Sequence, residues 1–162
     1  MTTIACDGKM IAADGLVTGN GFIHDRTCKK VFRLHDGRVV AFSGSAFDIA
    51  GAVDYLNGVT AQFSAEEGFE AVILSADGTV QCMDEKTRLY AQSVPCVSGS
   101  GGAIALGAMA AGKDAFEAVK IAAELDTHSG GVCSFLIPTE GDADHIMPPP
   151  VQDAGPLESE AA

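Results

Sequence analysis

Short apolar runs joined by glycine-containing turns fill the first half of the chain. Runs of this length on either side of Asp-Gly are typical of β-hairpins. Three hairpins are predicted in this way: residues 3–6 with 9–13, residues 30–34 with 38–42, and residues 70–74 with 79–83. The glycine-rich stretch 15–27 between the first two hairpins predicts a loop with a short strand.

Apolar positions take on a helical spacing after residue 45. Ser45 is placed to cap a helix that Asn57-Gly58 would end. The apolar face expected for this helix consists of Phe47, Ile49, Ala50, Val53, Tyr55 and Leu56. The stretch that follows, up to residue 68, does not clearly favour helix or strand.

The last third of the chain is predominantly helical. Residues 102–112 are rich in alanine and nearly free of charge, which predicts a buried helix. Asp114 and Glu117 match a capping box and open a second helix, which Gly130-Gly131 would follow. The apolar run 132–137 predicts a final buried strand.

This order of elements predicts an α+β fold. Consecutive hairpins imply mainly antiparallel pairing. The strands are apolar on both faces, so both faces of each sheet need a cover. We therefore expect a four-layer αββα sandwich of two mainly antiparallel sheets, formed by residues 1–138. Residues 139–162 are acidic and contain Pro148-Pro149-Pro150, which predicts a partly disordered C-terminal tail.

The charge of the chain narrows the classes of partner. Twenty-two acidic and 10 basic residues give a formal net charge of −12, which argues against binding nucleic acid or an anionic membrane surface.

No apolar run is long enough to span a bilayer, and the N-terminus lacks the pattern of a signal peptide. We therefore expect a cytoplasmic protein. The five cysteines and four histidines are scattered, so neither a metal site nor a cofactor is expected.

The candidate chemistry begins at Thr2. If Met1 is removed, this residue carries a hydroxyl nucleophile and an α-amine base on neighbouring atoms. A free α-amine titrates near pKa ~7.7–8.0, close to the working pH of a general base. The alternative is that Thr2 and Thr3 simply begin a strand.

Taken one at a time, the other polar motifs are unspecific. Residues 98–102 form a glycine-rich turn before a helix, but they match neither a dinucleotide fingerprint nor a phosphate-binding loop. Asp126 and Ser129 could belong to an ordinary helix end. Lys30 could be a solvated charge, and Asp14 could be a turn residue.

Together these motifs resemble the proteasome β-subunits and the related bacterial ATP-dependent peptidase, which are N-terminal-nucleophile hydrolases. The resemblance extends from Thr2 to about Ile137. It rests on Thr2-Thr3-Ile4, Ile11-Ala12-Ala13-Asp14-Gly15, Lys29-Lys30-Val31, Ser43-Gly44-Ser45-Ala46-x-Asp48, Gly99-Ser100-Gly101-Gly102 and Asp126-x-x-Ser129-Gly130-Gly131. It implies the αββα fold of that superfamily and threonine-type endopeptidase activity.

The resemblance also implies a role for each motif. Thr2 would be the nucleophile, Lys30 a cation beside its hydroxyl, and Asp14 the partner that holds Lys30. The backbone N–H of Gly44 would form the oxyanion hole. Three further residues would surround the Thr2 amine and tune its protonation: Ser100, Asp126 and Ser129. The substrate pocket would include Val17, Cys28, Phe32 and Phe42, which suggests an apolar or mixed pocket.

One departure from the family pattern concerns assembly. Two helices normally separate the oxyanion glycine from the next hairpin, and only one fits here, so the chain looks like a reduced member. The resemblance implies polypeptide substrates, a self-compartmentalising homo-oligomeric ring and an ATP-dependent unfoldase as partner. Two alternatives remain: an amidase that acts on a small amide, and a catalytically silent assembly protein of the same fold.

Overall fold

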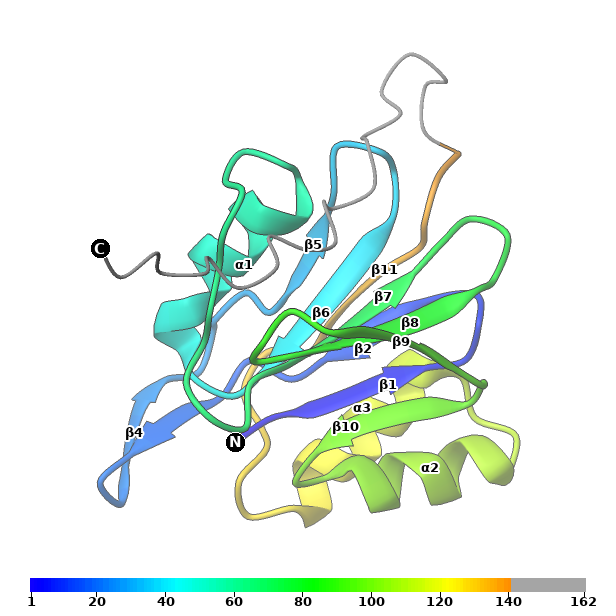
Figure 1. The fold of residues 1–162 in the computed structure, drawn as a ribbon. Coiled ribbons are helices and arrows are strands. Elements are labelled where there is room, and N and C mark those ends of the chain that lie inside the picture. Colours follow the sequence, from blue (N-terminus) through cyan, green and yellow to red (C-terminus); the bar gives the residue numbers. More distant parts are fainter. Residues whose placement is uncertain (141–162) are drawn as a thin grey trace, which may run out of the picture.

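Two antiparallel sheets form the centre of the molecule in a computed structural model, which describes residues 1–140 (Figure 1). The first sheet has the order β10-β1-β2-β11, with β10 Cys96–Gly99, β1 Thr3–Cys6, β2 Ile11–Ala13 and β11 Ser134–Leu136. The second has the order β5-β6-β7-β8-β9, with β5 Val31–Arg33, β6 Val39–Ser43, β7 Glu70–Leu74, β8 Val80–Asp84 and β9 Leu89–Gln92. All three predicted hairpins are present.

The period of two along each strand explains why the strands are apolar on both faces. On β1, Ile4 and Cys6 enter the core between the two sheets, whereas Ala5 packs toward the helices. On β6, Ala41 enters the same inter-sheet core, whereas Phe42 packs in a second core on the opposite face. Each sheet therefore buries both of its surfaces.

Helices cover the outer face of each sheet (Figure 1). Helices α2 (Gly102–Ala110) and α3 (Ala115–Leu125) pack on the first sheet. The short 3-10 helix η1 (Ala46–Asp48) leads into α1 (Ile49–Leu56), which packs on the second. The predicted capping box is confirmed, because Asp114 accepts a hydrogen bond from the Glu117 backbone and Glu117 accepts one from the Asp114 backbone. The four-layer αββα sandwich is thus confirmed.

The structure adds strands that were not predicted. Residues 15–27 form a complete hairpin, β3 (Val17–Gly19) and β4 (Phe22–Asp25), as a separate two-stranded sheet. Strands β9 and β10 were missed altogether. All residues of β4 and β9 are exposed, so these strands lack the alternation of buried and exposed side chains that identifies a strand in a sequence.

Three expectations about burial were wrong. Phe47 was expected on the buried face of the first helix, but it lies in η1 and is 96% exposed. Helix α2 buries only Gly102 and Ala105, so it is a surface helix. The last strand is half-exposed, with Phe135 at its centre in contact with solvent. The Ser45 side chain forms no capping hydrogen bond.

The chain leaves the sandwich next to the β5–β6 hairpin. The Thr139 backbone donates to the Gly37 carbonyl over 3.0 Å, and Arg33 Nη1 donates to Thr139 Oγ1 over 3.1 Å. Most of the predicted acidic tail, residues 141–162, lies outside the described residues, so the boundary at residue 138 stays a prediction. Among residues 1–140, no helix combines the length and the apolar character needed to cross a membrane.

Candidate active site

Thr2 lies directly before β1, at the end of the first sheet. Its side chain is buried, whereas Met1 is 59% exposed. Gly99 of β10 lies against the Thr2 backbone. Its φ is +87°, and a Cβ at this residue would overlap the Thr2 carbonyl oxygen. Glycine is needed at residue 99 because the backbones of the two strands approach so closely. This close packing holds the backbone that carries the Thr2 side chain.

Lys30 contacts the Thr2 hydroxyl directly. Its Nζ atom donates to Thr2 Oγ1 over 2.9 Å, to the Leu16 carbonyl over 2.6 Å and to Asp14 Oδ1 over 3.2 Å. Lys30 is only 3% exposed. An ammonium group has three protons to donate, and each has an acceptor here. The charge is buried and fully satisfied, with one proton directed at the candidate nucleophile.

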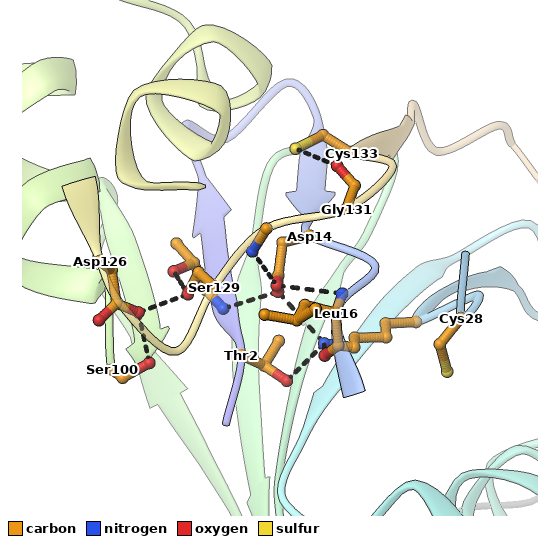
Figure 2. Close-up of polar contacts among 12 residues, drawn as sticks. Thr2, Asp14, Leu16, Cys28, Ser100, Asp126, Ser129, Gly131 and Cys133 are labelled. Carbon is orange, nitrogen blue, oxygen red and sulfur yellow. Dashed lines mark hydrogen bonds and ion pairs between the residues drawn. The ribbon is translucent and has the colours of Figure 1, made fainter. Parts of the chain in front are cut away.

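Asp14 forms an ion pair with this lysine, and Figure 2 shows the Asp14 carboxylate close to Leu16. Its Oδ1 atom accepts from the Thr3 backbone over 2.9 Å, and its Oδ2 atom accepts from the Gly130 backbone over 2.9 Å and from the Leu16 backbone over 3.3 Å. The carboxylate is buried and draws its donors from three separate segments of the chain. Its orientation is thus set by the fold and not by Lys30 alone.

A second polar cluster contains Ser129, Asp126 and Ser100, which lie together in Figure 2. Asp126 Oδ2 accepts from the hydroxyls of Ser100 and Ser129, each over 2.6 Å. The Ser129 and Thr3 hydroxyls lie 2.6 Å apart. Burial by itself would raise the pKa of Asp126, but hydrogen bonds from the two hydroxyls and the His128 backbone, with the nearby His128 charge, together outweigh it and lower the pKa. The cluster is therefore built around an anion.

This cluster contacts the site through Thr3. We expect Ser100, Asp126 and Ser129 to surround the amine that Thr2 gains when Met1 is removed, and this stays a prediction. In the described residues their hydrogen bonds run to one another and to the side chain of Thr3. A Cβ on Gly101 would overlap the Thr3 hydroxyl oxygen, so a glycine there makes room for it. Thr3 was not among the predicted site residues, although its alternation with Thr2 in an extended segment places it toward the helices.

Gly44 follows β6 at the same end of the molecule. The Phe42 backbone donates to the Lys30 carbonyl over 3.1 Å, so the end of β6 lies beside Lys30. Gly44 has a φ of +106°, and a Cβ there would lie 2.7 Å from the Cα of Phe69. Both facts require glycine. Gly44 is exposed, as a backbone donor to a substrate must be.

The expected substrate pocket is only partly assembled. Cys28 and Phe32 line an open groove of about 410 Å³, together with Lys29, Ala46, Ile49, Ala50, Val53 and Asp54. Val17 does not line it. Phe42 is not in the groove either, because it points to the core beneath α1, where its ring packs on those of Phe32 and Phe69 at 5.9 and 5.7 Å. The groove wall supplied by η1 and α1 was not predicted.

The comparisons with known proteins agree with this geometry. A family model described as "Proteasome subunit" matches residues 2–93, more than half of the chain. The chain belongs to the proteasome subunit family. The match includes Thr2, Asp14, Lys30 and Gly44. By its family the protein is an N-terminal threonine peptidase, which disfavours the silent assembly protein. No curated protein matches the chain.

Solved structures support the fold of this family member. Thiobacillus denitrificans BPH is 20% identical, with a TM-score of 0.63 over 88% of this chain and 99% of that one. The same protein in complex with epoxomicin is 21% identical, with a TM-score of 0.65 over 87% and 99%. Eukaryotic HslV from Trypanosoma brucei is 20% identical, with a TM-score of 0.60 over 85% and 98%.

Proposed function

We propose that this proteasome-family protein is an endopeptidase that uses Thr2 as its nucleophile after Met1 has been removed. The observation that carries the proposal is the 2.9 Å hydrogen bond from the buried Lys30 ammonium group to the Thr2 hydroxyl. A buried cation aimed at a hydroxyl stabilises the alkoxide that must form when this hydroxyl attacks. A threonine that merely begins a strand has no need of it.

The exposure of Met1 supports its removal. Once the peptide bond before Thr2 is cut, the free amine lies on the same residue as the hydroxyl and serves as the general base. The Thr2 oxygen then attacks the carbonyl carbon of the peptide substrate, and its proton passes to the amine. The amine returns that proton to the leaving nitrogen, and an ester to Thr2 remains. Water hydrolyses the ester and restores the hydroxyl.

The neighbouring residues have distinct roles in this scheme. Lys30 lowers the energy of the developing alkoxide, and Asp14 keeps Lys30 in place. The N–H of Gly44 stabilises the oxyanion, a contribution of roughly 2.7–4 kcal/mol for one such donor. Ser129 and Asp126 orient Thr3, and with it the backbone that carries Thr2. Cys28 and Phe32 contact the substrate side chain in the groove, whose lining is mostly apolar.

We further propose that the protein works as a self-compartmentalising homo-oligomer that cleaves unfolded polypeptides supplied by an ATP-dependent unfoldase. Support comes from the family, and from the near-complete coverage of BPH and HslV by this chain. Native mass spectrometry at micromolar concentration tests the assembly. A multimer is expected, and a monomer alone would contradict this part of the proposal.

The small helical layer on the second sheet favours one alternative. Only η1 and α1 cover that face, and residues 57–69 form no second helix beside them. An open monomer with the same catalytic residues would suit an amidase that acts on a small amide. A monomeric protein that cleaves a small amide but no peptide would favour this alternative.

Covalent labelling tests the nucleophile. Purified wild type and Thr2→Ala are treated with epoxomicin, the molecule bound in the similar BPH structure, and their intact masses are measured. We expect wild type to lack Met1 and to gain the mass of one inhibitor per chain, while Thr2→Ala gains none. Retention of Met1, or equal labelling of both proteins, would contradict the proposal.

A further inference from the structure

Four polar side chains form a hydrogen-bonded network that joins the two sheets close to the proposed oxyanion donor. Ser43 on β6 and Ser98 on β10 place their hydroxyl oxygens 3.1 Å apart. The Ser98 hydroxyl donates to Glu70 Oε2 on β7, and the Tyr90 hydroxyl on β9 donates to Glu70 Oε1 over 2.8 Å. None of these residues has a role in the scheme above.

The direction of the hydrogen bonds follows from the number of protons. A serine hydroxyl has a single proton to donate. Since Ser98 donates its proton to the Glu70 carboxylate, it can only accept from Ser43. Ser43 therefore donates to Ser98, and Ser98 donates to Glu70. Tyr90 donates to the other oxygen of the Glu70 carboxylate. Ser43 and Ser98 are both buried, so an unpaired hydroxyl here would be unfavourable.

This network connects the strand before the Gly44 donor with the strand beside Thr2. Ser43 directly precedes Gly44, and in the β6–β7 register it lies opposite Glu70. Ser98 directly precedes Gly99, the residue that lies against the Thr2 carbonyl. Each serine is thus directly bonded to a glycine whose backbone belongs to the site. The Ser43–Ser98 hydrogen bond is a direct link between the strand of the oxyanion donor and the strand beside the nucleophile.

We propose that Ser43, Ser98 and Glu70 are positioning residues that fix the Gly44 N–H relative to the Thr2 hydroxyl. The inference rests on the proposed function, because it assumes that Gly44 stabilises the oxyanion. The β6 and β10 strands belong to different sheets, and no backbone ladder holds them in register with each other. A side-chain link therefore does what backbone pairing does within a sheet.

The test compares Ser98→Ala with Ser75→Ala in the full chain after Met1 removal. Ser75 lies in the turn after the far end of β7, where its backbone forms the only hydrogen bonds found for it among the described residues. For Ser98→Ala we expect kcat on a fluorogenic peptide to fall about 10-fold, as for a small misplacement of a catalytic group, with KM unchanged within twofold. Ser75→Ala should match wild type. Ser43→Ala should resemble Ser98→Ala, and the double variant should be no worse than either single variant, because all of them break the same link.

Epoxomicin labelling separates positioning from folding. If Ser98 only positions Gly44, the variant labels more slowly but reaches the same final fraction as wild type. A final fraction that falls in proportion to kcat means that part of the protein is misfolded, and this overturns the inference. A normal kcat in Ser98→Ala overturns it as well, but leaves the proposed function intact. If wild type itself is not labelled, the proposed function fails and the inference fails with it.

Discussion

The two polar clusters beside Thr2 and Thr3 differ in how the fold holds them. The Lys30–Asp14 pair is closed to solvent, with its side chains 3% and 0% exposed. Its donors and acceptors include three backbone N–H groups and one backbone carbonyl. In the Ser100–Asp126–Ser129 cluster the carboxylate is bound mainly by two side-chain hydroxyls, and Ser100 is exposed.

This difference predicts that the two clusters respond differently to substitution. The stability of a buried ion pair depends strongly on both partners, because removing one leaves the other as an uncompensated buried charge. A cluster of hydroxyls around a partly solvated carboxylate can exchange a lost contact for water. Substitutions in the first cluster should therefore damage both folding and catalysis, whereas those in the second should affect them mildly.

The largest effect is expected for Lys30→Ala. It removes the cation beside the Thr2 hydroxyl and leaves Asp14 buried without its counter-charge. We expect peptidase activity to fall by about 10²- to 10³-fold, as when a preorganised electrostatic contact is lost. The free energy of unfolding should fall by about 3 kcal/mol, the low end for a broken buried pair, because three backbone donors still bind Asp14. Peptide hydrolysis and urea denaturation measure the two effects.

The neighbouring lysine provides a matched control. Lys29 lies at the groove, with its ammonium group 4.7 Å from the centre of the Phe32 ring, and forms no ion pair among the described residues. Lys29→Ala should leave stability nearly unchanged and affect KM more than kcat. An equal loss of kcat in both variants would mean that Lys30 acts through general charge and not through its contact with Thr2.

A smaller effect is expected for Ser129→Ala. The substitution removes one donor to Asp126 and the contact with the Thr3 hydroxyl, but Ser100 still binds the carboxylate. We expect a loss of roughly 1.5 kcal/mol in stability, the low end for a hydrogen bond to a charged group, because the carboxylate is partly solvated. Activity should fall about 10-fold, through the orientation of Thr3 and Thr2. Ser100→Ala, at the exposed end of the cluster, should have less effect on activity. The reverse order would place the functional contact at Ser100.

The first cluster was accessible from the sequence and the second only in part. Asp14 and Lys30 follow or precede strands that Asp-Gly turns make predictable, so their positions at the sheet ends could be inferred. The link from Ser129 to Thr3 could not, because it depends on the close approach that glycines 99 and 101 permit. Strand β10, which brings those glycines to the site, has only four residues and was not predicted.

The groove shows a different limit of sequence reasoning. Phe42 was placed there by resemblance, but alternation along β6 sends it to the side of α1, with Val40. Which face of a strand lies toward which layer depends on the register with the neighbouring strands, and one residue of shift reverses it. Cys28 and Phe32 do line the groove, since they lie beside Lys30 at the open edge of β5. The opposite wall comes from η1 and α1, whose packing no local pattern specified.

The smallest effect is the dependence of the second cluster on pH. The pKa of Asp126 is lowered in the folded protein, so its ionised form stabilises the fold fully above the ordinary carboxyl pKa of about 3.9. This contribution is lost as the pH falls through the lower, folded value. Wild type should therefore lose thermal stability below about pH 4 more steeply than Asp126→Asn, when Tm is measured between pH 2.5 and about 7.

Asp25, whose pKa is lowered by the Thr27 backbone and hydroxyl, is a matched control on the exposed β3–β4 hairpin. Asp25→Asn should change the acid limb in the same direction but leave peptidase activity unchanged. Parallel Tm curves for wild type and Asp126→Asn would show that the hydroxyl cluster does not stabilise the anion.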